Sequence, residues 1–247
     1  MACATPYCPE VSDLAGWFDS YGHTIVVFTC AEGPMPHIAL REDLFGITSL
    51  LDYRPQTAAP LCALTQVMLR GPSSLTEAER ELIATYVSQR NECTFCATAH
   101  GSATCHSVGG DITQVEGVRA DLASAPVSDK MRALLQIAGK VQQNGNVMQQ
   151  SDADAARAAG ATDIEIHDTV LIAALFCLYN RYVDGLATRT PTDPAYYDAL
   201  GARITSRGYT MPPTGYRPLV DAPRRDASGD ECDPKSMHAS QQVAGER

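Results

Sequence analysis

The chain has 247 residues, of which 45% are hydrophobic and 19% are charged, a balance typical of a globular protein of one domain with or without extensions. Its formal net charge of −10 argues against nucleic acid or an anionic membrane as a partner, because both attract clustered lysine and arginine. The first residues lack a basic stretch followed by an apolar run, and the longest apolar run, 169–178, is about half of the roughly 20 residues that span a bilayer. We therefore expect a soluble, cytoplasmic protein.

The first 40 residues give weak structural signals. Residues 13–18 indicate a helical turn and residues 24–29 have the composition of a strand, before a glycine and two prolines interrupt the chain. From residue 221 the chain turns polar and loses its periodicity, which is typical of a disordered or loosely packed tail. We interpret residues 1–40 as an N-terminal extension, 41–220 as one helical domain and 221–247 as a flexible tail.

Between the two ends, apolar residues recur at three- and four-residue spacing, which predicts an all-α fold. A threonine and a glutamate three residues apart, Thr76 and Glu79, form a capping-box pattern at the start of one helix. The last long helix is apolar around much of its circumference and is expected to be central. The segment 191–215 carries four prolines and is expected to return toward the body. The expected helices cover residues 41–54, 57–69, 76–90, 93–108, 128–143, 151–159 and 163–186.

The chemically informative stretch contains Cys93, Cys96 and His100. If Cys93 opens a helix, steps of about 100° per residue place the other two side chains within about 60° of it, on one face. Residues three apart on a helix have Cα atoms about 5–6 Å apart, a separation that a disulfide tolerates. The pair can therefore open and close with little movement of the backbone.

The position of the pair also favours reactivity. The unpaired N–H groups and the dipole at a helix N-terminus stabilise a thiolate, which is the nucleophilic form of cysteine. A neighbouring histidine can accept the thiol proton and later return it to a leaving oxygen. Glu81, on the preceding helix, is the candidate for the carboxylate that orients His100, because an antiparallel helical hairpin can bring them together.

Each of these residues has an ordinary interpretation as well. The chain has nine cysteines, so two of them fall close together by chance fairly often, and a lone histidine is more often a core or surface residue than a catalyst. Glu81 is one of several acidic residues near a helix start, where acids complement the dipole. A zinc site of Cys93, Cys96, His100 and His106 is a further alternative, but structural zinc pairs usually lie in tight turns and not inside a continuous helix.

The combination is more specific than its parts. The pattern is a glutamate, eleven residues, a cysteine, two residues, a cysteine, three residues and a histidine. It fits Glu81, Cys93, Cys96 and His100 without a gap. With the flanking residues 50–55, 69–71 and 176–185, this pattern resembles the AhpD/carboxymuconolactone decarboxylase family, in particular its peroxidase-like branch. The resemblance covers roughly residues 40–215 and implies an AhpD-like helical bundle that uses no metal or organic cofactor.

The resemblance also implies roles for the four residues. Cys96 would be the peroxidatic thiol that attacks a hydroperoxide, Cys93 the resolving thiol, and His100 with Glu81 the proton relay. The residue before the second cysteine is histidine in the best-studied AhpD proteins and is Phe95 here, so the relay would be shorter. Members with lactone decarboxylase activity lack the cysteine pair, which counts against that reaction.

We therefore expect a thiol-dependent hydroperoxide reductase. A helical protein disulfide oxidoreductase or redox sensor would use the same residues, and a zinc-stabilised binding protein is a third possibility. The resemblance further implies a homo-oligomer and a thiol or lipoyl-type electron donor. The sequence identifies neither the hydroperoxide nor the donor.

Overall fold

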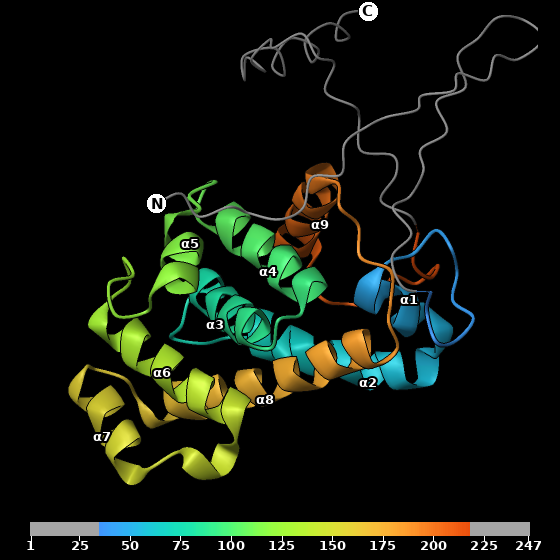
Figure 1. Cartoon of the computed structure of the whole chain (residues 1–247). Helices are drawn as coiled ribbons and strands as arrows, with labels where there is room; N and C mark the ends of the chain where they lie inside the picture. The colour runs from blue at the N-terminus through green and yellow to red at the C-terminus, as the bar shows by residue number, and fades with distance from the viewer. Residues whose placement is uncertain (1–34, 218–247) are drawn as a thin grey trace, which may run out of the picture.

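A computed structural model describes residues 35–217, and within this range the chain is helical and contains no strand. The helical turn and the strand expected within residues 13–29 lie outside the described residues, as does the tail from 221. The helices, drawn in Figure 1, are α1 (Gly46–Tyr53), α2 (Pro55–Arg70), α3 (Glu77–Arg90), α4 (Thr94–Ser107), α5 (Thr113–Ala120), α6 (Asp129–Gln143), α7 (Gln150–Ala158), α8 (Asp163–Gly185) and α9 (Pro194–Arg207), with a short 3₁₀ turn at Gly145–Val147.

Two of these helices were not predicted. The helix α5 is short and buries only Val115 and Val118, so its apolar periodicity is weak. No helix was assigned to 191–215 from the sequence, but α9 occupies much of this segment. Pro194 is the first residue of α9, where a proline removes no hydrogen bond, and the side chain of Asp193 accepts from the Ala195 N–H as a cap. The proline therefore starts a helix.

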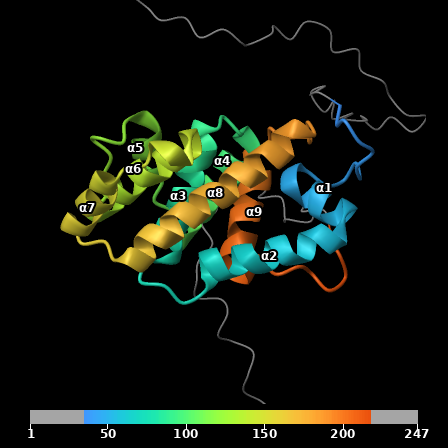
Figure 2. The ribbon, with the colours of Figure 1, turned by 90° about the horizontal axis from the view of Figure 1, so that it is seen from below.

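The helices α3 and α8 form the centre of the bundle. The helix α8 runs along the molecule from α6 and α7 at one end to α1 at the other, as Figures 1 and 2 show. Nine consecutive residues of α3, from Arg80 to Ser88, are buried because α4, α6 and α8 pack around it. No helix of residues 35–217 is long and apolar enough to cross a membrane.

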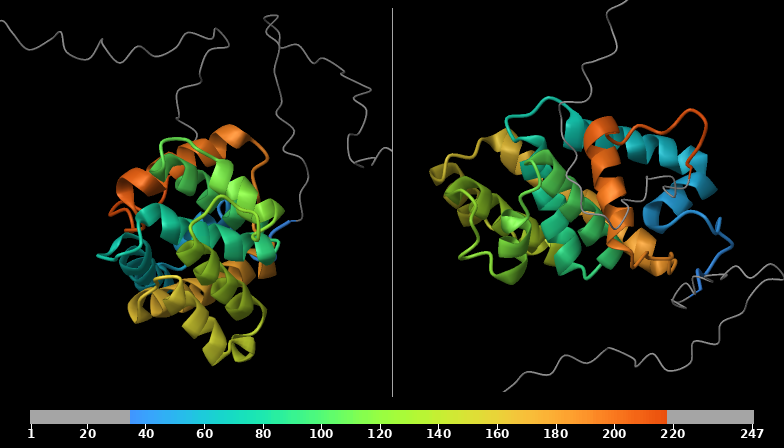
Figure 3. Two further views of the ribbon diagram at one scale, coloured as in Figure 1. Left: turned by 90° about the vertical axis from the view of Figure 1, so that its left-hand side faces the viewer. Right: turned by 90° about the horizontal axis from the view of Figure 1, so that it is seen from above.

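A tight turn between α3 and α4 positions the cysteine pair. The capping box of Thr76 and Glu79 fixes the start of α3, as predicted. At its other end the chain reverses within three residues, with Glu92 at φ 58° and the Cys93 N–H donating to the Ser88 carbonyl over 3.1 Å. This reversal lays α4 along α3, and α9 covers another side of α4 (Figure 3).

Candidate active site

A buried carboxylate lies at the centre of the site. Glu81 of α3 has no exposed surface, and its Oε2 lies 2.7 Å from Nδ1 of His100 on α4. Its other oxygen, Oε1, accepts from Arg70 Nη2 over 2.6 Å and from the Tyr209 hydroxyl over 2.5 Å. Burial alone would raise the pKa of Glu81, but His100, Arg70 and Tyr209 together keep that pKa below its usual value. The carboxylate is therefore ionised at neutral pH.

His100 is held by this carboxylate and by aromatic rings. Its imidazole meets the edge of Phe176 with ring centroids 4.5 Å apart and lies parallel to the ring of Tyr209 at 6.0 Å. Burial, and then the charge of Glu81, raise the pKa of Tyr209 well above its usual value, so its hydroxyl remains a donor. With Nδ1 of His100 directed at Glu81, Nε2 is the nitrogen left to exchange a proton with a reacting group.

The two cysteines lie at the start of α4, and both are free thiols. Cys93 is the residue before the first turn and Cys96 is in that turn, with exposed fractions of 0% and 3%. A hydrogen bond to the Cys96 sulfur, together with burial, raises the pKa of Cys93. Cys93 is therefore protonated at neutral pH, and Cys96, which lines the same cavity as His100, is the candidate nucleophile of the pair.

The two cysteines face different hollows of the molecule. Cys96, His100 and Phe95 line a cavity of about 410 Å³ between α4, α9 and the segment after α9. Cys93 instead contributes to a broader pocket of about 1110 Å³, which also includes Ala97 and Gly101 of α4. At about 100° per residue, Cys93 and Cys96 are about 60° apart around α4, so they border the two hollows from neighbouring parts of the helix surface.

The residues of the alternative zinc site do not come together. Residues 35–217 contain no group of three or more histidine, cysteine or acidic side chains that could hold a metal ion. His106, the fourth ligand of that alternative, places its Nε2 atom 2.9 Å from Asp198 Oδ1 on α9. The arrangement therefore gives no support to a zinc site.

Phe95 occupies the position at which the family resemblance leads us to expect a histidine, and its role there is structural. Its side chain is 2% exposed and packs against the ring of Tyr197, with centroids 6.0 Å apart, and against Gly46 at the start of α1. A phenyl ring carries no titratable proton. Phe95 therefore anchors the start of α4 to α1 and α9 and takes no part in proton transfer.

Two residues of the site were not singled out from the sequence. Arg70 belongs to a segment noted only for its family resemblance. Its position eleven residues before Glu81 carries no recognisable signal of a role in the site. Tyr209 follows α9 and lies 128 residues from Glu81 along the chain, beyond any local periodicity. Asn180 of α8, by contrast, has a structural contact: it bonds to Ser88 of α3 and to Asn91 directly after α3.

An all-helical bundle with two buried cysteines beside a histidine–carboxylate pair is an arrangement that thiol redox chemistry can use. Residues 55–140 match the model of the carboxymuconolactone decarboxylase family. Over these residues the resemblance indicated by the sequence is confirmed, and so is the AhpD-like all-α fold. No curated protein matches the chain.

Solved structures share this fold. An uncharacterised peroxidase-related protein of Silicibacter sp. TM1040 is 25% identical, with a TM-score of 0.55 over 59% of this chain and 76% of its own. A peroxidase-related protein of Ralstonia eutropha JMP134, described as an alkylhydroperoxidase AhpD core, is 26% identical, with a TM-score of 0.56 over 62% and 78%. A protein of unknown function from Agrobacterium tumefaciens shares the fold at 20% identity, with a TM-score of 0.51 over 58% and 97%.

Proposed function

We propose that the chain is a thiol-dependent hydroperoxide reductase in which Cys96 reacts with the hydroperoxide. The observation that carries this proposal is that His100, held by a 2.7 Å hydrogen bond to the buried Glu81, lines the same cavity as Cys96. A fixed histidine at this position can take the Cys96 proton and hold it for the leaving oxygen.

The first step is attack of the Cys96 thiolate on the terminal oxygen of the hydroperoxide. The O–O bond breaks, a sulfenic acid forms on Cys96, and the alkoxide leaves as an alcohol with the proton that His100 had taken from the thiol. Glu81 stabilises the protonated imidazole during this transfer, while Arg70 and Tyr209 keep the carboxylate in place.

The second step uses Cys93. It lies three residues before Cys96 at the start of α4, and Cys96 acts on its pKa, so its sulfur lies near enough to attack the sulfenic sulfur. A disulfide forms between the two sulfurs, and the hydroxyl leaves with the Cys93 proton as water. A thiol or lipoyl-type donor then reduces the disulfide by two exchange steps and is itself oxidised.

A protein disulfide oxidoreductase would need the same pair to meet the surface of another folded protein. The exposed fractions of Cys93 and Cys96 are 0% and 3%, so neither sulfur can be contacted there without opening of the helix start. Burial therefore favours a small hydroperoxide over a folded protein as the oxidising substrate.

The test is mass spectrometry of the alkylated protein before and after one equivalent of cumene hydroperoxide. We expect the mass of one disulfide, mapped to the peptide that contains Cys93 and Cys96, together with loss of one equivalent of hydroperoxide. Both thiols remaining alkylatable after the hydroperoxide is added would contradict the proposal.

A further inference from the structure

The cavity beside Cys96 has a size and polarity that suit a particular kind of ligand. Its volume of about 410 Å³ lies within the range of roughly 300–1,000 Å³ typical of small-molecule sites. Most of its wall is apolar or aromatic, and no aspartate or glutamate lines it. The apolar part of the wall includes Ile47, Leu51, Phe176, Leu200, Ile204 and Met211.

Two arginines interrupt this apolar wall. Arg203 and Arg207 follow Leu200 on α9 at three- and seven-residue spacing, so all three lie on the face of the helix that borders the cavity. Cys96 and His100 belong to a different wall, which α4 provides. An apolar space thus extends between a reactive thiol and a pair of positive charges.

Arg203 has no anionic partner among residues 35–217. Its guanidinium makes no ion pair or hydrogen bond there, and the ionisable groups that act on it are Arg207 and the tyrosines Tyr196, Tyr209 and Tyr216. Burial raises the pKa of each of these tyrosines, that of Tyr196 to about 12, so their hydroxyls are neutral at physiological pH.

Arg70, by comparison, is an arginine of the site whose charge is paired. The guanidinium of Arg70 meets Glu81 at 2.6 Å and Glu77 at 3.3 Å. In Arg203 burial lowers the pKa, and the neighbouring charge of Arg207 contributes in the same direction. A half-buried guanidinium without a counter-charge is costly, and a bound anion would remove that cost.

We propose that the cavity takes amphipathic hydroperoxides that carry a carboxylate, with Arg203 binding the carboxylate and the hydroperoxide group lying at Cys96. This inference rests on the proposed peroxidase function and names its substrate class. A carboxylate matches the planar fork of a guanidinium, which can donate two parallel hydrogen bonds to its oxygens. The apolar wall between the two ends would hold a hydrocarbon chain.

Binding can be measured without any turnover. Isothermal calorimetry of the reduced full-length protein would compare decanoate with methyl decanoate, which differ in charge and share the same chain. We expect decanoate to bind roughly tenfold more tightly or better, the effect of a charge-assisted hydrogen bond in a cavity. Equal affinities would overturn the inference and would leave the proposed reaction untouched.

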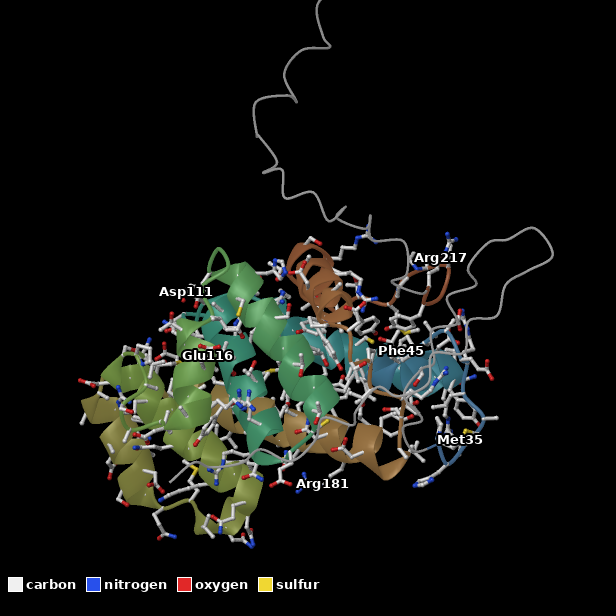
Figure 4. The ribbon with its side chains drawn as sticks, turned by 45° about the horizontal axis from the view of Figure 1, so that its top comes forward. Met35, Phe45, Asp111, Glu116, Arg181 and Arg217 are labelled. Atoms are coloured by element: carbon white, nitrogen blue, oxygen red, sulfur yellow. The ribbon has the colours of Figure 1, made fainter. Side chains whose placement is uncertain are left out.

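Turnover supplies the second measurement. The KM for a medium-chain fatty acid hydroperoxide is compared with the KM for its methyl ester in the wild type, Arg203→Met and Arg203→Lys. We expect the preference for the acid to vanish in Arg203→Met and to return in part in Arg203→Lys. The matched control is Arg181→Met on α8, whose side chain is exposed in Figure 4 and bonds only to a carbonyl of its own helix.

The two proposals fail in different ways. If neither the acid nor the ester is reduced while decanoate still binds through Arg203, the proposed reaction is wrong and the carboxylate site stands. If both are reduced with the same KM in the wild type, or if Arg203→Met keeps the preference, the carboxylate site is wrong and the reductase stands.

Discussion

The Glu81 carboxylate bonds to Nδ1 of His100 across the α3–α4 hairpin, at 2.7 Å and without access to water. The bond leaves Nε2 of the imidazole as the nitrogen that can serve Cys96, and it sets the orientation of the ring at the same time.

Replacing the histidine should remove the proton relay and leave the bundle folded. We expect His100→Gln to lower kcat/KM for cumene hydroperoxide by about 10²–10⁴-fold, the usual contribution of a general acid–base group. Stopped-flow consumption of the hydroperoxide measures this loss, and circular dichroism checks the fold. His167→Gln, at an exposed histidine of α8, is the control and should retain the wild-type rate.

The two cysteines should give different products when each is replaced. Cys96→Ser should consume no hydroperoxide, whereas Cys93→Ser should consume one equivalent and stop with a sulfenic acid on Cys96 that dimedone labels. Mass spectrometry of the labelled peptide distinguishes them. Cys177→Ser, at a cysteine of α8, should behave as wild type. Exchange of the two phenotypes would reverse the assigned roles.

The hydroxyl of Tyr209 should affect how activity depends on pH. It donates to Glu81 over 2.5 Å and helps to keep the pKa of that carboxylate low. Tyr209→Phe removes a donor to the charged form, so the pKa of Glu81 should rise and the acidic limb of the kcat/KM profile should move to higher pH. Tyr53→Phe, at an exposed tyrosine, should leave the profile in place. An unmoved acidic limb in Tyr209→Phe would show that its hydroxyl does not tune the pair.

The charge of Glu165 should make part of the free energy of unfolding depend on pH. Burial tends to raise its pKa, but bonds from Lys130, Thr162 and Ser74 outweigh burial and lower it from 4.5 to about 2. Its contribution to the free energy of unfolding is therefore complete above pH 4.5 and is lost as the pH falls toward 2. Urea unfolding at several pH values should show the gap between wild type and Glu165→Gln narrowing over this range.

The control for this measurement is Glu116→Gln, because Glu116 is exposed and bonds to no side chain among the described residues. Its free energy of unfolding should follow that of the wild type at every pH. A gap for Glu165→Gln that stays constant from pH 7 to pH 2.5 would mean that the carboxylate charge does not contribute as argued.

Gly46 allows α1 to approach α4. Its φ of +51° is unfavourable for other residues, and a Cβ atom there would overlap the ring of Phe95. We expect Gly46→Ala to lower the free energy of unfolding by about 2–4 kcal/mol, from backbone strain and overpacking together. Thermal or chemical unfolding measures the loss. Gly145→Ala, where a Cβ atom meets open space, should change stability by about 0.5 kcal/mol or less.

The sequence was sufficient for the parts of the fold that depend on local patterns. The capping box at Thr76 and the apolar stripes of α6 and α8 each lie within one helix, and both predict that helix correctly. The helix α9 was missed because its segment was noted only for its four prolines, although Asp193 before Pro194 marks a helix start. Prolines alone do not distinguish a helix start from a break in the chain.

The candidate site likewise has parts that local sequence patterns predict and parts that they do not. Glu81 and His100 lie nineteen residues apart on two helices joined by a short turn, so their approach follows from hairpin geometry. Tyr209 and Arg203 reach the site from the last helix and the segment after it, and their positions depend on how α9 packs against α4. Contacts of that range leave no periodicity in the chain.

The two hollows beside α4 have a kinetic consequence. Cys96 lines the narrow cavity and Cys93 lines the broad pocket, so in the proposed reaction the hydroperoxide and the electron donor would approach the pair from different hollows. Donor thiol that attacks the Cys93 sulfur would release Cys96 while the cavity is already free to accept the next hydroperoxide. Double-reciprocal plots at several donor concentrations should then be parallel, with no mutual inhibition when both reactants are abundant.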